Sequence, residues 1–226
     1  NVFNISTTGG KAEAGSAYAI NAIASDFKVT GNDITTVSNG PNLAIYFPSH
    51  MGTPCDAVIE NNTIKVTGLA TSANEIGLVS GIEIQTGDVE IKGNTIYTYS
   101  IGEYAEGNYI FGISYAQDGT TSDVEITDNT VKTEGHYAIS FRKVDDAVIT
   151  GNTLYAHELT GDDAVYIASG SGNTVENNLP DNPTSIKYIR TQNIDGTDCY
   201  FDLNGRRIEN PATKGIYIHN GKKVVI

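Results

Sequence analysis

The sequence predicts an all-β protein: a parallel β-helix with three short strands per coil and about six coils, followed by a small C-terminal β appendage. Three observations predict it. A segment centred on one asparagine recurs six times, aliphatic residues alternate on both sides of that asparagine, and a further apolar strand precedes each repeat. Such recurrence is typical of a solenoid, in which each coil buries its apolar face only against its neighbours.

The six repeats align without gaps, and their asparagines are separated by 30, 32, 35, 23 and 26 residues. The irregular intervals indicate a constant core with loops of varying length. The segments are FKVTGNDI (27–34), AVIENNTI (57–64), VEIKGNTI (89–96), VEITDNTV (124–131), AVITGNTL (147–154) and NTVENNLP (173–180), and the shared asparagines are Asn32, Asn62, Asn94, Asn129, Asn152 and Asn178.

A β-branched residue stands three positions before the asparagine in every repeat, and an aliphatic residue stands two positions after it in the first five, as Val29 and Ile34 do. Alternation by two places these side chains on the inward face of strands. The residue directly before each asparagine is Gly, Asn or Asp, types that tolerate positive φ, which predicts a sharp corner there.

A further strand precedes each repeat, at 17–23, 43–47, 81–85, 111–115, 137–141 and 164–168. With Ile20, Ile45 and their equivalents facing inward, alternation predicts a column of outward residues. Tyrosines beside amides and carboxylates suit sugar rings, and the alternative interpretation is ordinary solvated strand surface. The predicted binding residues are Tyr46, Glu83, Ser114, Ser140, Arg142 and Tyr166, with Asn21 and Gln85 on the same face.

The pattern over roughly residues 12–180 resembles the right-handed, single-stranded parallel β-helix repeat shared by pectate lyases, polygalacturonases and many surface proteins. The resemblance implies that each asparagine lies in the turn between the second and third strands and bonds to its neighbours in adjacent coils. A stacked amide satisfies the polar groups of a buried turn at every coil. The opening segment, residues 1–7, has a strand pattern, so further coils are expected before it.

Residues 181–226 form a separate C-terminal module, in which YFDLNGRRIENPATKGIYIHNGKKVVI (200–226) predicts three strands with turns at 204–205, 211 and 220–221. Asn-Gly at the last turn is a strong hairpin signal. The segment resembles the C-terminal module of many exported Bacteroidetes proteins, which implies export from a Gram-negative bacterium to the medium or the cell surface. A small β cap closing the β-helix is the other interpretation. The matching residues are Asp202, Leu203, Gly205, Arg206, Gly215, Tyr217 and Gly221.

Gly161-Asp162-Asp163 resembles the GDD motif of polygalacturonases. The resemblance implies that Asp162 and Asp163 are the acid and base, because hydrolysis needs one carboxyl to protonate the leaving oxygen and another to activate water. The non-catalytic interpretation is a solvated acidic corner before a strand. Gly135-His136-Tyr137 stands where that family has Asn-Thr-Asp one coil earlier.

The charge distribution disfavours several partners. The chain carries a net charge of −13, and residues 1–180 hold 7 Lys and Arg against 22 Asp and Glu. An acidic body disfavours nucleic acid and anionic lipid, and no stretch approaches the roughly 20 apolar residues that span a bilayer. A polyanionic polysaccharide is expected to need a bridging cation such as Ca²⁺.

Six positions before the repeat asparagines stand Asp26, Asp56, Asp88, Asp123 and Asp146. They either form a ladder that binds cations or accept backbone N–H groups in their turns. Two cysteines, Cys55 and Cys199, make neither a disulfide framework nor a zinc site, and are expected to be free thiols or one long-range bridge. No cofactor is predicted, with Ca²⁺ as the one metal considered.

The leading interpretation is therefore an exported, non-catalytic β-helix that recognises carbohydrate or serves in display and adhesion at the cell surface. The first alternative is a polysaccharide-degrading enzyme, either a polygalacturonase-like hydrolase or a pectate-type lyase. A lyase needs carboxylates for Ca²⁺ and a basic residue, for which Arg142 and Glu83 are available two coils apart. The second alternative is a structural spacer.

Overall fold

The computed structural model describes residues 1–7, 16–22, 26–48, 56–69, 78–85, 87–101, 109–115 and 123–180, together with four short strands between residues 200 and 225. The chain divides into two compact units, Asn1–Asp181 and Asn182–Ile226. Cys55 and Cys199 lie outside the described residues.

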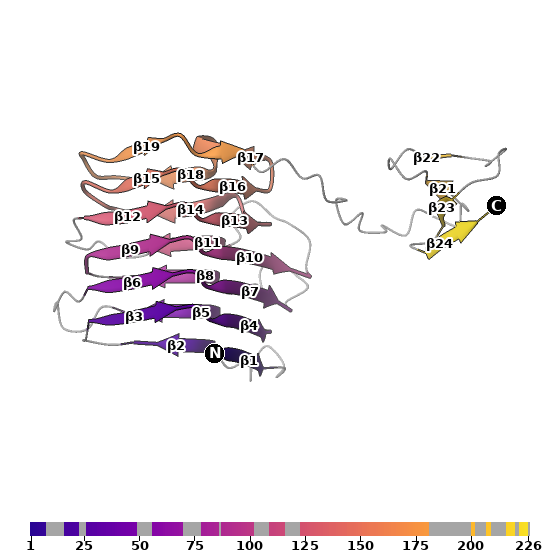
Figure 1. Ribbon diagram of the computed structural model, residues 1–226, viewed down its shortest axis with the longest axis horizontal. Helices are drawn as coiled ribbons and strands as arrows, with labels where there is room; N and C mark the ends of the chain where they lie inside the picture. Colours follow the sequence, from indigo (N-terminus) through magenta and orange to yellow (C-terminus); the bar gives the residue numbers. More distant parts are fainter. Residues whose placement is uncertain are drawn as a thin grey trace. The chain divides into compact units, whose positions relative to one another are not determined.

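The first unit is the predicted parallel β-helix, with three sheets running along its axis (Figure 1). Sheet A contains β1 (Val2–Thr7), β4 (Asp33–Ser38), β7 (Thr63–Gly68), β10 (Thr95–Ser100), β13 (Thr130–Thr133), β16 (Thr153–Ala156), β17 (Leu159–Thr160) and β20 (Leu179–Pro180). Sheet B contains β2 (Ala17–Asn21), β5 (Asn42–Phe47), β8 (Val79–Ile84), β11 (Ile110–Tyr115), β14 (Tyr137–Phe141) and β18 (Val165–Ile167). Sheet C contains β3 (Phe27–Thr30), β6 (Ala57–Glu60), β9 (Val89–Lys92), β12 (Val124–Thr127), β15 (Val148–Thr150) and β19 (Thr174–Glu176).

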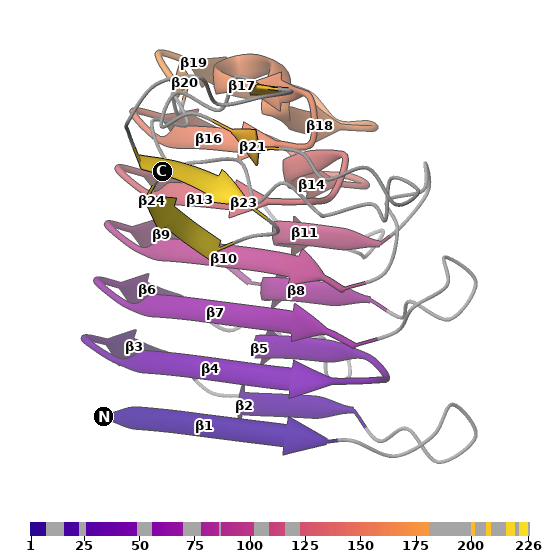
Figure 2. The ribbon, with the colours of Figure 1, turned by 90° about the vertical axis from the view of Figure 1, so that its right-hand side faces the viewer.

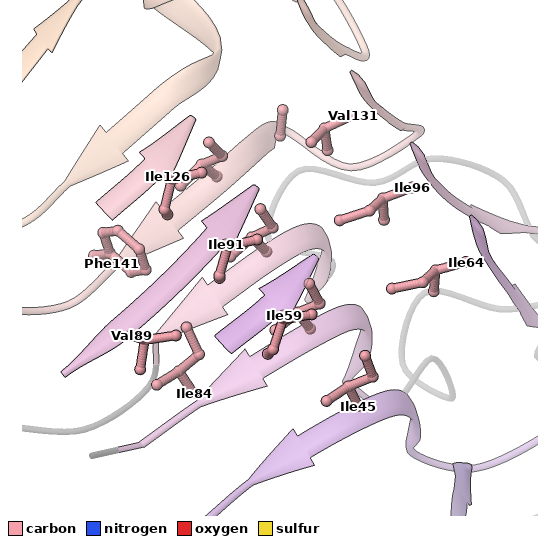
Figure 3. Close-up of a cluster of buried hydrophobic side chains, with 14 of the residues drawn as sticks. Ile45, Ile59, Ile64, Ile84, Val89, Ile91, Ile96, Ile126, Val131 and Phe141 are labelled. Carbon is pink, nitrogen blue, oxygen red and sulfur yellow. The ribbon is translucent and has the colours of Figure 1, made fainter. Parts of the chain in front are cut away.

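Neighbouring strands pair in parallel and place like residue over like. Ile59, Ile91 and Ile126 form one file, and Ile64, Ile96 and Val131 form another (Figure 3). All six side chains are fully buried, and each contributes about 1.5–3 kcal/mol through burial. One strand departs from the parallel pattern, since β17 turns back antiparallel to β16 before the 3₁₀ helix η2 (Gly161–Ala164) leads into β18.

The corners before the repeat asparagines are confirmed. Every residue at that position has a positive φ between 55° and 69°, a region that glycine, asparagine and aspartate tolerate best. These residues are Gly31, Asn61, Gly93, Asp128, Gly151 and Asn177.

The asparagine ladder is confirmed too, and it is longer than predicted. The side-chain amide of each asparagine donates to Oδ1 of the next at 2.8–3.0 Å, from Asn1 through to Asn178. From Asn62 onward each amide also donates to a backbone carbonyl of the preceding coil, as Asn94 does to Ile59 at 2.8 Å. Asn1 is an additional first rung.

A column of small residues on sheet B was not predicted by simple alternation. Each small residue stands directly before an inward aliphatic residue, as Ala44 does before Ile45. Two consecutive residues therefore face the core. A Cβ on Gly112 would lie 2.1 Å from a methyl carbon of Val131 on sheet A, so the close approach of the two sheets excludes a larger residue. The column is Ala19, Ala44, Gly81, Gly112, Ala138 and Ala164.

The second unit contains an antiparallel sheet of four short strands, where the sequence predicted three. Their order is β22-β21-β23-β24, with β21 (Tyr200–Phe201), β22 (Arg207–Ile208), β23 (Ile216–His219) and β24 (Lys222–Val225). His219 pairs with Lys222 as in a hairpin, while the predicted turn residues at 204–205, 211 and 220–221 lie outside the described residues. Within the described part of the chain, no helix is long and apolar enough to cross a bilayer.

Candidate functional site

The predicted binding residues form one file on the outer face of sheet B. Strand pairing aligns six of them, one per coil, from β2 to β18. The file is Asn21, Tyr46, Glu83, Ser114, Ser140 and Tyr166. Gln85 and Arg142 each follow the end of a strand, at β8 and β14.

The members of this file differ in exposure. Asn21 and Tyr166 are exposed, and Tyr46 and Ser140 are half-buried. Glu83, which alternation predicted to face solvent, is 0% exposed, and Ser114 is 4% exposed. Alternation determines which face of a strand carries a side chain, but not what lies over that face.

Glu83 is held in a buried hydrogen-bonded cluster. Its Oε2 bonds to the Ser114 hydroxyl, which lies 2.9 Å from the Ser80 hydroxyl, and Ser80 donates to the Ile82 carbonyl oxygen at 2.9 Å. Each hydroxyl has a single proton. Ser114 gives its proton to Glu83 Oε2 and can therefore only accept from Ser80, whose own proton also faces the Ile82 carbonyl oxygen.

Burial raises the pKa of Glu83 from 4.5 to about 7, although hydrogen bonding from Ser114 and Gln85 acts in the opposite direction. Oε1 of Glu83 has no hydrogen-bond partner among the described residues. The cluster therefore contains a carboxyl group whose pKa is raised to about 7 and which is closed off from solvent.

Stacked tyrosine pairs lie toward the two ends of sheet B. Tyr18 and Tyr46 have ring centroids 5.3 Å apart at an interplanar angle of 22°, and Tyr137 and Tyr166 have centroids 4.8 Å apart at 17°. Burial, Tyr18 and Glu83, in that order, raise the pKa of Tyr46. The sequence interpretation missed Tyr18, Ser80 and Tyr137, although they share one column, three residues before the outward file.

Asp162 and Asp163 lie in η2, directly before β18, which carries Tyr166 of the sheet B file. Asp162 Oδ1 accepts hydrogen bonds from the backbone N–H of Asn178 at 3.0 Å and from its side-chain amide at 2.7 Å. It therefore occupies the position that the next asparagine would take, and ends the ladder. Asp163 is exposed. Their roles as acid and base remain a prediction, but Asp162 has a structural function that the motif did not reveal.

Asp162→Ala is expected to lower the free energy of unfolding by about 1–2 kcal/mol, because two donors of Asn178 lose their acceptor. Asp162→Asn keeps an acceptor oxygen and should remain within about 0.5 kcal/mol of the wild type. Urea unfolding followed by circular dichroism measures both. Equal stabilities for the alanine and asparagine variants would contradict a ladder-ending role.

The aspartate column shows no metal cluster. Among the described residues, no group of three or more His, Cys, Asp and Glu side chains is placed to hold a metal ion. Asp26 Oδ1 accepts the backbone N–H of Asp56 at 3.1 Å, across coils rather than within its own turn. Burial and the neighbouring Asp56 and Asp123 carboxylates raise the pKa of Asp88. At Asp26 the acceptance of a backbone N–H is therefore seen, and around Asp88 the stacked carboxylates repel one another.

Comparison with known proteins gives one match. A family model described as a right handed beta helix region matches residues 111–226, just over half of the chain. No curated protein and no solved structure matches the chain.

Proposed function

This chain belongs to the right-handed β-helix family, and from that premise we propose that it is an exported surface protein that binds carbohydrate on the outer face of sheet B without cleaving it. The proposed ligand is an oligosaccharide lying across successive coils. The resemblance of the C-terminal segment to modules of exported proteins supports export and a place at the cell surface.

The observation that carries the proposal is the pair of tyrosine stacks with a polar file between them. Tyr46 lies four coils from Tyr166, about 19 Å at roughly 4.8 Å per coil. Tyrosine rings provide flat apolar faces for sugar rings. Between Tyr46 and Tyr166, the half-buried Ser140 can offer its hydroxyl to a sugar hydroxyl, while Glu83 and Ser114 are buried.

Among the described residues of the sheet B file, the pair of flanking carboxyl groups that a glycoside hydrolase uses is not found. Hydrolysis of a glycosidic bond needs two carboxyl groups flanking the bond. Within the described file on sheet B, Glu83 is the one carboxyl-bearing residue, and Asp162 is bonded to Asn178.

Tyr46→Ala and Tyr166→Ala are each expected to weaken binding of a glycan identified on an array by about three- to tenfold, since an aromatic contact contributes about 0.5–1.5 kcal/mol. Binding is measured by calorimetry with and without Ca²⁺. Val148→Ala, which trims an exposed apolar side chain on sheet C, is the control and should bind as the wild type does. Unchanged affinity in both tyrosine variants would place the ligand elsewhere.

The enzymatic alternative rests on Asp163, the exposed carboxylate of the GDD motif. It is tested by reducing-sugar release from pectic and other polysaccharides, with Asp163→Asn as the variant. Turnover that the variant abolishes would replace the binding proposal with hydrolysis.

A further inference from the structure

The outer face of sheet A carries a second file of residues, three positions after the repeat asparagines. Strand pairing places Lys65, Tyr97, Lys132 and Tyr155 directly over one another on β7, β10, β13 and β16. We call this file the lysine–tyrosine column, and Figure 2 views the sheet that carries it. Cations and aromatic rings alternate in it, coil by coil.

The column is accessible and partly preorganised. Tyr97 is 38% exposed and Lys65 is exposed. The Lys132 ammonium lies 5.7 Å from the centroid of the Tyr97 ring, within the range of a cation–π contact. The Tyr155 hydroxyl donates to the His157 carbonyl oxygen at 3.2 Å, which orients its ring. A row of threonine hydroxyls runs beside the column, at Thr63, Thr95, Thr130 and Thr153.

The charge of this face differs from that of the rest of the β-helix. Strands β7, β10, β13 and β16 contain two lysines and no acidic residue, and Asp33 lies on the neighbouring β4. Sheet C, by contrast, carries four glutamates against two lysines, Lys28 and Lys92, on its strands and is preceded by the aspartate column. Sheet C therefore repels a polyanion, whereas the lysines of the lysine–tyrosine column attract one. No bridging Ca²⁺ is needed at this column.

The spacing within the column indicates the kind of polyanion. At roughly 4.8 Å per coil, Lys65 and Lys132 are about 10 Å apart, as are Tyr97 and Tyr155. A sugar ring in an extended chain advances by a length similar to one coil, so two coils correspond to a disaccharide. In a chain bound along the column, each lysine would therefore lie beside every second sugar, and each tyrosine beside the sugar between.

We propose that the lysine–tyrosine column binds a linear polysaccharide in which acidic and uncharged sugars alternate. The chain lies along the β-helix axis, with carboxylate or sulfate groups on Lys65 and Lys132. The uncharged rings pack on Tyr97 and Tyr155. This site is independent of the one proposed on sheet B.

The test is calorimetric titration of the whole chain, with EDTA present, against three probes of matched length. Hyaluronan fragments alternate glucuronate with an uncharged sugar, oligogalacturonate is charged at every sugar, and dextran is neutral. Hyaluronan is expected to bind most tightly. The Lys65→Ala/Lys132→Ala double variant should weaken hyaluronan binding about fivefold, and Tyr97→Ala by a similar factor.

The matched control is Lys28→Ala/Lys92→Ala, which removes the same charge from sheet C and should leave hyaluronan binding within about twofold of the wild type. Equal losses of hyaluronan affinity in the two double variants would show that the effect comes from the overall charge of the protein, and would overturn the proposal. So would oligogalacturonate binding as tightly as hyaluronan, or no binding of hyaluronan at all. Tyr46→Ala and Tyr166→Ala should retain hyaluronan binding, which separates this site from that on sheet B.

Discussion

Asn94→Ala is expected to lower the free energy of unfolding by about 3–5 kcal/mol, because several buried polar groups lose a partner at about 1–3 kcal/mol each. Asn94 is 1% exposed and lies in the middle of the ladder. Its amide donates to Asn129 and to the Ile59 and Lys92 carbonyls, and its Oδ1 accepts from the backbone and the side chain of Asn62. Alanine removes all five bonds and leaves their buried partners unsatisfied. Chemical denaturation followed by circular dichroism measures the loss.

Asn61→Gly is the control for this prediction. Asn61 stands directly before Asn62, the rung that precedes Asn94. It is exposed and has a φ of 55°, so glycine adopts its conformation without strain. Its stability should stay within about 1 kcal/mol of the wild type. A loss below about 1 kcal/mol for Asn94→Ala would show that the ladder does not hold the coils together.

Glu83→Gln is expected to remove a pH dependence of stability. The folded pKa of about 7 lies above the ordinary 4.5, so the folded state retains a proton that the unfolded chain has already released. The stability of the wild type should therefore fall as the pH rises from about 4.5 to about 7, by about 3 kcal/mol in total. Glutamine mimics the protonated acid and cannot ionise. The variant should match the wild type at pH 4 and exceed its stability by about 3 kcal/mol at pH 8.

The measurement is denaturant unfolding at a series of pH values between 4 and 8. Glu125→Gln removes an exposed carboxylate from sheet C and should retain the wild-type fall. Parallel pH profiles for the wild type and Glu83→Gln would mean that the pKa of Glu83 in the folded protein stays near its ordinary value. The raised pKa described for the sheet B cluster would then be wrong.

The repeat was sufficient to predict the coils. The columns of aliphatic residues, the asparagines and the positive-φ corners each recur at one position of the aligned segments, and each has the structural role that its chemistry requires. The same alignment contained Lys65, Tyr97, Lys132 and Tyr155 in one column. That column becomes a surface only because parallel pairing in register places one coil directly over the next.

By itself, the sequence determined the fold class, the strand faces and the register, because those follow from local periodicity repeated coil after coil. The tertiary structure decided the environment of each side chain. It buried Glu83 where alternation predicted exposure, since burial depends on what packs over a strand. It also bonded Asp162 to Asn178, 16 residues away, because the chain turns back at β17 and returns over the last rung. A short motif gives the identity of a carboxylate, but only the path of the chain determines which group that carboxylate meets.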